Sequence, residues 1–178
     1  MSKFNTAFII KMSIYILTLL SIAVSCKQAE TKNSTELADE VTIIAQEKEA
    51  ILKTLNNETK AAFQRDYDAW QENWVHDPDI TKIYLDFPEN TLSESVGWEE
   101  ISGFVKTFFK ENPEPEPVPK LLDSIDVRLY GNGAWVTYEQ QDSLRGRKRE
   151  TRLMEKVNGE WKIAGMQTTI YGFEKIKE

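Results

Sequence analysis

The spacing of apolar residues predicts a long amphipathic helix at the start of the folded region. Apolar side chains recur three or four positions apart between Ile51 and Trp74, which places them on one helix face. The sequence His76-Asp77-Pro78 ends this helix, because proline lacks a backbone donor. We expect a bend at Arg65-Asp66, between two helical segments.

A second helix is predicted to open at residues 97–101, where two glutamates in the first turn suit the helix dipole. Its predicted buried face comprises Ile101, Phe104, Val105 and Phe108. Alternating prolines in residues 113–119 then favour a stiff, extended connector over a helix or an inner strand.

The remaining pattern is typical of strands. Residues 80–87 are β-like, and four further strands are predicted at residues 121–130, 134–142, 147–157 and 161–171. Two glycine-containing turns, Gly131-Asn132-Gly133 and Asn158-Gly159, connect these strands into a meander. Helices followed by a curled, mostly antiparallel sheet form an α+β arrangement, with the helices on the concave face.

The N-terminus has the composition of a targeting segment. Lys3 and Lys11 accompany an apolar run over residues 13–24, which is shorter than the roughly 20 residues that span a bilayer. Ala23-Val24-Ser25-Cys26 resembles a bacterial lipobox, in which the cysteine is lipidated and becomes the mature N-terminus. The alternative is an ordinary secretory peptide, or a membrane anchor, with an incidental cysteine.

The lipobox resemblance sets the predicted organisation of the chain. Residues 1–25 form a signal peptide, residues 26–42 a lipidated cysteine and polar tether, and residues 43–178 one domain. We expect anchoring to the lipid bilayer through acylated Cys26, in the cell envelope of a bacterium. Lys27 provides no acidic retention signal after the cysteine, so the outer membrane is the expected destination.

Composition and charge narrow the classes of partner. Of 178 residues, 40% are hydrophobic and 29% charged, which suits a globular domain with a sizeable core. The net charge of −7 repels phosphate backbones, so nucleic acid is not an expected partner. Cys26 is the sole cysteine, which rules out an internal disulfide and a thiolate metal site. We expect neither a metal nor a cofactor.

The order of elements and motifs resembles one known superfamily. The motifs are Tyr130-Gly131-Asn132-Gly133-Ala134-Trp135-Val136, Arg149-x-Thr151-x-Leu153-x-x-Lys156 and Asn158-Gly159-x-Trp161-Lys162-Ile163. Together with the helices they resemble the nuclear transport factor 2-like (SnoaL-like) superfamily over residues 47–173. The resemblance implies a conical α+β fold that encloses a pocket. Members include isomerases, cyclases, dehydratases, binding modules and assembly domains, so the fold alone does not give the function.

The resemblance implies one candidate catalytic residue. Asp86, in Leu85-Asp86-Phe87-Pro88, stands where isomerase-like members carry a general base. An acid between a strand and a proline also suits a turn or cap. Glu58 and Thr151 stand where those enzymes place two oxyanion donors, and neither reproduces that chemistry. The single histidine, His76, is expected at a helix end.

Strand alternation sorts the side chains between the two faces of the sheet. The predicted concave set comprises Ala134, Val136, Tyr138, Gln140, Arg149, Thr151, Leu153, Trp161, Ile163, Gly165, Gln167 and Thr169. Trp135, with Met154 or Met166, is predicted on the convex face. An exposed aromatic and methionine patch marks an interface, so a homodimer is expected.

We predict a pocket in the cone, used mainly for binding a small apolar or mixed ligand. The predicted lining residues are Trp70, Trp74, Tyr84, Phe104, Phe108, Tyr138, Gln140 and Gln167. Two alternatives stay open at this point. One is an isomerase, cyclase or hydratase with Asp86 as base, and the other is a structural dimerisation module with a filled cone.

Overall fold

The computed structural model describes residues 38–142 and 146–171. The chain divides into two compact units, residues 1–45 and 46–178. The predicted signal peptide, Cys26 and most of the predicted tether lie outside the described residues. Residues 38–42, predicted as the end of the tether, are helical, and Thr42 Oγ1 donates to the Ala38 carbonyl at 2.8 Å. In the described part of the chain, no helix is both long and apolar enough to cross a membrane.

The helices of the second unit follow the predicted pattern. The first helix continues to residue 64, where Arg65 adopts a left-handed backbone with φ 61°. Asp66 then caps α2 (Tyr67–Gln71) by accepting from the Ala69 amide at 3.0 Å, so the predicted bend is confirmed. The second predicted helix is α3 (Trp98–Glu111). Gly97 precedes α3 at φ 82°, and a Cβ there would lie 3.0 Å from the Pro78 carbonyl oxygen.

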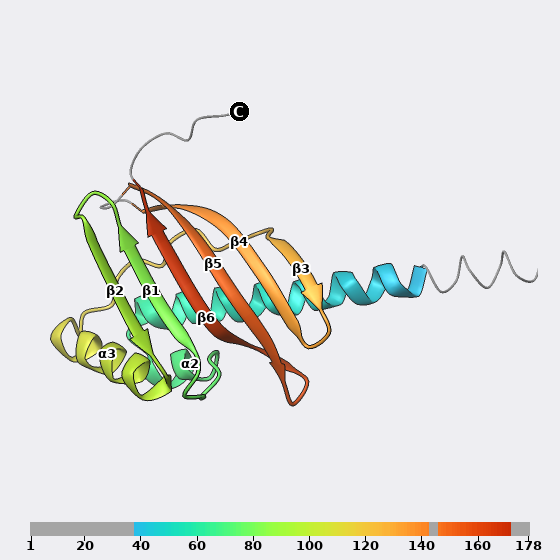
Figure 1. Ribbon diagram of the computed structural model, residues 1–178, viewed down its shortest axis with the longest axis horizontal. Helices are drawn as coiled ribbons and strands as arrows, with labels where there is room; N and C mark the ends of the chain where they lie inside the picture. The colour runs from blue at the N-terminus through green and yellow to red at the C-terminus, as the bar shows by residue number, and fades with distance from the viewer. Residues whose placement is uncertain (1–37, 143–145, 172–178) are drawn as a thin grey trace, which may run out of the picture. The chain divides into compact units, whose positions relative to one another are not determined.

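Six strands form one curved sheet in the order β2-β1-β6-β5-β4-β3 (Figure 1). Their bounds are β1 (Thr81–Asp86), β2 (Thr91–Val96), β3 (Asp126–Tyr130), β4 (Gly133–Asp142), β5 (Gly146–Val157) and β6 (Glu160–Ile170). Strands β1 and β6 pair in parallel, and the other neighbouring pairs are antiparallel. The predicted meander, β3 to β6, is confirmed. The predicted strand 121–130 is shorter, because residues 121–125 are irregular.

Strand β2 is absent from the sequence prediction. It pairs only with β1, and its side chains are exposed or half-buried, so it carries no alternation of apolar and polar residues.

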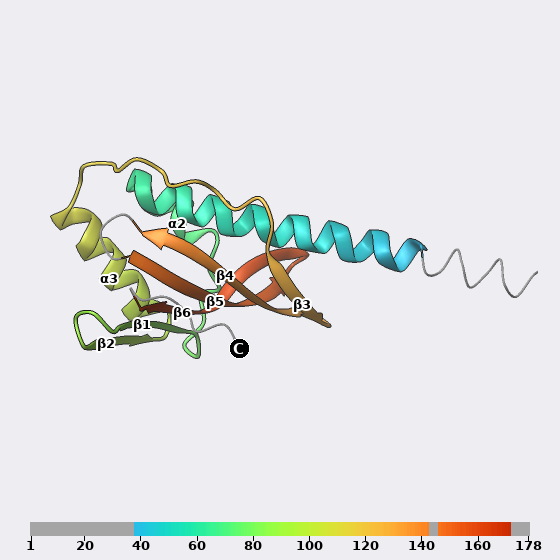
Figure 2. The same ribbon diagram turned by 90° about the horizontal axis from the view of Figure 1, so that it is seen from above.

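The first helix lies across one face of the curved sheet (Figure 2). We call the helix-covered face concave and the opposite face convex. Helix residues Ile51 and Leu55 are buried together with Val136 and Ile163 of the sheet.

The residues of β5 that point to the concave face differ from the predicted ones. Glu150, Arg152 and Met154 are buried, whereas Leu153 is exposed, so the predicted inward set of this strand is wrong. The turn Asn158-Gly159 explains the difference, because it pairs Met154 with Ile163. Directly paired residues share a face, and Ile163 points into the core.

A β-bulge changes the alternation of β6. Leu153 pairs with Gly165 and Met154 with Ile163, so Ala164 is an extra residue on β6. Beyond this point the inward residues are Met166, Thr168 and Ile170, and Gln167 is exposed. The prediction that Gln167, Gly165 and Thr169 face inward is therefore wrong. Met154 and Met166 are buried on the concave face, which also corrects their predicted place on the convex one.

The buried face of α3 is rotated from the prediction. Ile101, Ser102 and Val105 are buried, whereas Phe104 is 48% exposed and Phe108 40% exposed. Because serine is polar, the apolar periodicity of the sequence did not indicate that position 102 is buried. Ser102 Oγ donates to the Glu99 carbonyl at 3.4 Å, which satisfies its hydroxyl within the helix.

Candidate functional site

Backbone pairing aligns inward-facing side chains in rows across the concave face. The first row comprises Lys82, Met166, Arg152 and Val136. The second row comprises Tyr84, Thr168, Glu150 and Tyr138. The third row comprises Asp86, Ile170, Lys148 and Gln140. Polar and charged groups therefore gather at the centre of a face that the fold otherwise uses for its core. We call Glu58, Lys82, Tyr138, Glu150, Arg152 and Thr168, all buried, the interior polar cluster.

Arg152 is the centre of this cluster and is only 4% exposed. Its Nη2 lies 3.3 Å from Glu150 Oε2, and its Nε donates to the Tyr138 hydroxyl at 3.3 Å. Its Nη1 is buried without a hydrogen-bond partner among the described residues. Burial opposes the guanidinium charge, but Tyr138, Glu150 and Glu58 outweigh burial and raise the pKa of Arg152. The side chain therefore stays cationic with one unused nitrogen.

Glu150 is the buried counter-ion of Arg152. Its Oε1 pairs with Lys148 Nζ at 3.1 Å, and its Oε2 accepts from Thr168 Oγ1 at 2.7 Å. Burial by itself would raise the pKa of Glu150, but Arg152, Lys148 and the hydrogen bond from Thr168 lower it below its ordinary value. The carboxylate is therefore ionised, and both of its oxygens are engaged.

Lys82 brings a second cation to the same row from β1. The residue is 6% exposed, and its Nζ lies 4.3 Å from the ring centroid of Phe104 and 4.9 Å from that of Tyr84. No ion pair joins Lys82 to any described residue. Burial lowers the pKa of Lys82 to about 8, although Glu58 opposes this change. Lys82 is thus a desolvated ammonium that is held by aromatic rings.

Tyr138 and Glu58 complete the cluster. Burial raises the pKa of Tyr138 to about 12, so its hydroxyl stays protonated at neutral pH. Glu58, from the first helix, accepts from Trp70 Nε1 at 2.9 Å. The Trp74 ring lies beside that of Trp70 at a tilt of 40°, with ring centroids 5.4 Å apart, and its own buried Nε1 has no partner among the described residues.

The predicted lining residues occupy different environments. Trp70, Trp74 and Tyr138 are buried inside the cone, and Tyr84 and Gln140 face the same side from the second and third rows. Phe104 contacts Lys82, but Phe108 lies under Arg65, whose guanidinium is 5.1 Å from the ring centroid. Gln167 lies on the convex side, where its Nε2 donates to Thr169 Oγ1 at 3.3 Å. Whether a ligand cavity lies between the inward residues stays a prediction.

Asp86 and His76 each make local contacts near the ends of their own elements. Asp86 Oδ1 accepts from the Glu89 amide at 3.2 Å, in the turn between β1 and β2. His76 is exposed, stacks on Trp98 at a centroid distance of 3.8 Å, and its Nε2 lies 3.0 Å from the Gln71 carbonyl oxygen. Over residues 38–142 and 146–171, no three histidine, cysteine, aspartate or glutamate side chains are grouped so that they could hold a metal ion.

Five residues of the interior polar cluster were not among the predicted site residues: Glu58, Lys82, Glu150, Arg152 and Thr168. Strand β5 is charged on both faces, so polarity alone could not assign its inward side. One signal was present in the sequence. A two-residue Asn-Gly turn fixes the register of the hairpin, and inward Trp161 and Ile163 then require inward Met154 and, by alternation, Arg152 and Glu150.

The fold and the site define an α+β cone with a polar cluster on its concave face, the architecture of nuclear transport factor 2-like proteins. The family model for the SnoaL-like domain matches residues 51–170. The chain therefore belongs to the SnoaL-like domain family. No curated protein matches the sequence significantly.

Solved structures agree on the fold. A nuclear transport factor 2-like superfamily protein from Salmonella enterica is 19% identical, with 75% of this chain and 96% of that chain covered and a TM-score of 0.56. An NTF2-like protein of unknown function from Pseudomonas putida is 13% identical, with 75% and 98% covered and a TM-score of 0.54. One from Shewanella oneidensis is 19% identical, with 68% and 97% covered and a TM-score of 0.51. At these identities the likeness shows the fold alone.

Proposed function

We propose that the chain is a lipid-anchored binding protein whose SnoaL-like domain holds a small molecule against the concave face. The observation that supports this proposal is Arg152 Nη1, a buried charged donor without a partner among the described residues. An unsatisfied buried donor costs about 1–3 kcal/mol, and apolar side chains could fill such a core more cheaply. An acceptor on a bound ligand would satisfy this nitrogen.

Binding is favoured over turnover by the position of Asp86. A general base must reach the proton that it removes, whereas the Asp86 carboxylate caps a turn through the Glu89 amide. An isomerase, cyclase or hydratase reaction would therefore need Asp86 to leave that turn. The other alternative is a purely structural module, which would use the interior polar cluster only for packing.

Ligand-observed saturation-transfer NMR tests the binding proposal. We expect some members of a panel of small aromatic and aliphatic compounds to bind the protein. Met166 lies between Lys82 and Arg152 in the first row, so Met166→Trp should fill the interior and abolish the signal. Leu121→Trp, at an exposed connector position, is the matched control and should keep it. Absence of binding would favour the structural module, and binding unchanged in a folded Met166→Trp variant would place the ligand away from the concave face and contradict the proposal.

The anchoring proposal is supported by the lipobox-like sequence that ends at Cys26. We expect Cys26→Ser to remove the acyl mass and to release the protein from membranes, because the thiol is the site of lipidation. Membrane fractionation and intact mass measure both effects, and Ser25→Ala, which keeps a small residue before the cysteine, is the control. Fractionation of inner and outer membranes also tests the expected outer-membrane destination. Membrane retention of Cys26→Ser with an unchanged mass would contradict the proposal.

A homodimer through the convex face is proposed as well. Trp135 is 49% exposed and pairs there with exposed Leu153, beside a shallow depression of about 430 Å³ lined by Arg128, Tyr130 and Trp135. A standard interface of roughly 800 Å² per partner would cover this patch. Light scattering on a chain that starts at Lys27 should report a dimer, which Trp135→Glu splits and Leu121→Glu does not. A monomeric parent chain at high micromolar concentration would rule out this interface.

A further inference from the structure

We propose that the small molecule bound on the concave face is a carboxylic acid, whose carboxylate is held by Arg152, Tyr138 and Lys82. This inference rests on the proposed function and specifies the chemical class of the ligand. It follows from the balance of donors and acceptors in the interior polar cluster, from the placement of its cations and from the rings beside them.

The unused hydrogen-bonding groups of the interior are donors. The two buried side-chain atoms without a partner in the described part of the chain are Arg152 Nη1 and Trp74 Nε1, and both carry only N–H groups. The Tyr138 hydroxyl accepts from Arg152 Nε, which leaves its own proton without an acceptor among the described side chains. Lys82 Nζ makes only ring contacts, so its N–H groups are also unused.

The acceptors of the cluster are largely engaged. Glu150 uses Oε1 for Lys148 and Oε2 for Arg152 and Thr168. Glu58 uses Oε1 for the Trp70 indole. Among the described residues, the unpaired donors of Arg152, Tyr138, Lys82 and Trp74 therefore outnumber the one carboxylate oxygen of the cluster without a partner, Glu58 Oε2. A ligand rich in acceptors and poor in donors matches this surplus, and a carboxylate is such a group.

The two cations can reach the same ligand. Lys82 and Arg152 both pair with Met166, from β1 and β5 respectively, so their Cα atoms are about 10 Å apart on one face. Their long side chains can approach a group that lies over Met166. Glu58 and Glu150 are the carboxylates whose charges act on both cations. Counting Lys148, which pairs with Glu150, three cations face these two carboxylates, and the resulting net charge of +1 favours a monoanion over a more highly charged ligand.

The surroundings of Lys82 indicate the rest of the ligand. The rings of Tyr84 and Phe104 flank its ammonium group, and the neighbouring Met166 is apolar. An aromatic or aliphatic body attached to the carboxylate would contact these groups, as in sites that combine apolar walls with a few polar contacts.

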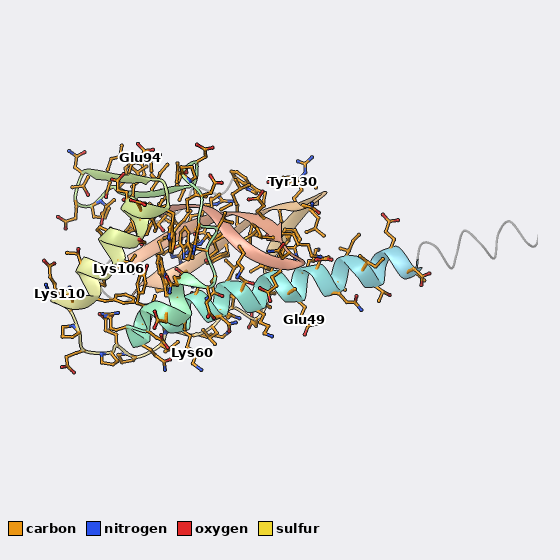
Figure 3. All side chains as sticks on the ribbon, turned by 90° about the horizontal axis from the view of Figure 1, so that it is seen from below. Glu49, Lys60, Glu94, Lys106, Lys110 and Tyr130 are labelled. Carbon is orange, nitrogen blue, oxygen red and sulfur yellow. The ribbon has the colours of Figure 1, made fainter. Side chains whose placement is uncertain are left out.

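Isothermal titration calorimetry on the full-length protein in a non-ionic detergent at pH 7 tests this inference. The probes are benzoate and hexanoate, each compared with its neutral amide. We expect at least one acid to bind about tenfold or more tightly than its amide, because charge-assisted hydrogen bonds are lost with the carboxylate. Lys82→Met should weaken acid binding by about tenfold, and Tyr138→Phe should also weaken it. Lys60→Met is the matched control, since Lys60 is exposed and points away from the sheet (Figure 3).

The outcomes separate this inference from the proposed function. Equal affinity for acids and amides, lost in Met166→Trp, would overturn the carboxylate assignment and keep an interior binding site. Failure of both acids to bind at millimolar concentration would overturn it too and would leave ordered water as the partner of Arg152. Acid binding that survives both Lys82→Met and Tyr138→Phe, with the folded state verified by circular dichroism, would place the anion elsewhere and contradict the proposal.

Discussion

Glu150→Gln is expected to lower the free energy of unfolding by about 3–5 kcal/mol, because it leaves a buried cation without its counter-ion. Arg152 is buried and keeps its charge, and Glu150 provides the carboxylate that pairs with it. Glutamine has nearly the same shape and can still accept from Thr168, but its amide NH2 cannot pair with Lys148, so the substitution removes the negative charge that both Arg152 and Lys148 use. Urea denaturation, monitored by tryptophan fluorescence, measures the change.

The matched control for this prediction is Glu155→Gln. Glu155 lies on the same strand but is exposed, so its neutralisation should change stability by no more than about 0.5 kcal/mol. Combining Glu150→Gln with Arg152→Met should restore part of the loss, because the second change removes the uncompensated cation. If the two single losses simply add, the side chains are not energetically coupled, and the ion pair is not the reason for the loss.

Lys82→Met is expected to have the opposite sign and to stabilise the protein at pH 7. The difference between the ordinary pKa of 10.5 and the folded-state pKa of about 8 corresponds to about 3 kcal/mol. Part of this gain is offset because the contacts of the ammonium with the Phe104 and Tyr84 rings are lost. We therefore expect a net gain of about 1–3 kcal/mol, or roughly 2–4 °C in Tm for each kcal/mol.

The pH dependence identifies the cause of this gain. Between pH 8 and 10.5 the unfolded chain binds the Lys82 proton more strongly than the folded one, so the stability of the parent protein rises with pH through this window. The protonation states of Glu150, Arg152 and Tyr138 stay constant through this window, because the pKa of Glu150 is lowered, that of Arg152 is raised and that of Tyr138 is about 12. The advantage of Lys82→Met should therefore shrink as the pH approaches 10.5.

Thermal unfolding at pH 7, 8.5 and 9.5 measures this difference, with Lys60→Met as the exposed control. Lysine at position 82 would then reduce stability while supporting anion binding, a combination that is common at functional sites. A destabilised Lys82→Met variant, or an advantage that does not change with pH, would show that the ammonium is not desolvated in the folded state.

The elements that local patterns specify could be predicted well. The helix face from Ile51 to Trp74, the bend at Arg65 and the Asn158-Gly159 hairpin follow from periodicity and turn chemistry within a few residues. Strand β2 carries no such local signal, since it is an exposed edge strand that pairs only with β1. The buried side of α3 was misassigned because Ser102 satisfies its hydroxyl within the helix and is buried without being apolar.

The candidate site was predictable only in part. Trp70, Trp74 and Tyr138 were expected inside the cone and are buried there. Gln167 was assigned to the wrong face, because one extra residue, Ala164, reverses the alternation beyond it. A bulge of this kind depends on how β5 and β6 pair, and the sequence of β6 by itself does not specify it.

The sequence by itself therefore determined the order of the elements other than β2, the family and the apolar helix face, since each depends on residues that are close along the chain. Only the tertiary structure decided that Lys82 and Arg152, which are 70 positions apart, share a row through Met166. Charged residues on a strand usually face solvent, and burial reverses that expectation only where partners from other elements meet them. Glu58, Glu150 and Tyr138 are those partners, and they come together only when the helix and the sheet pack.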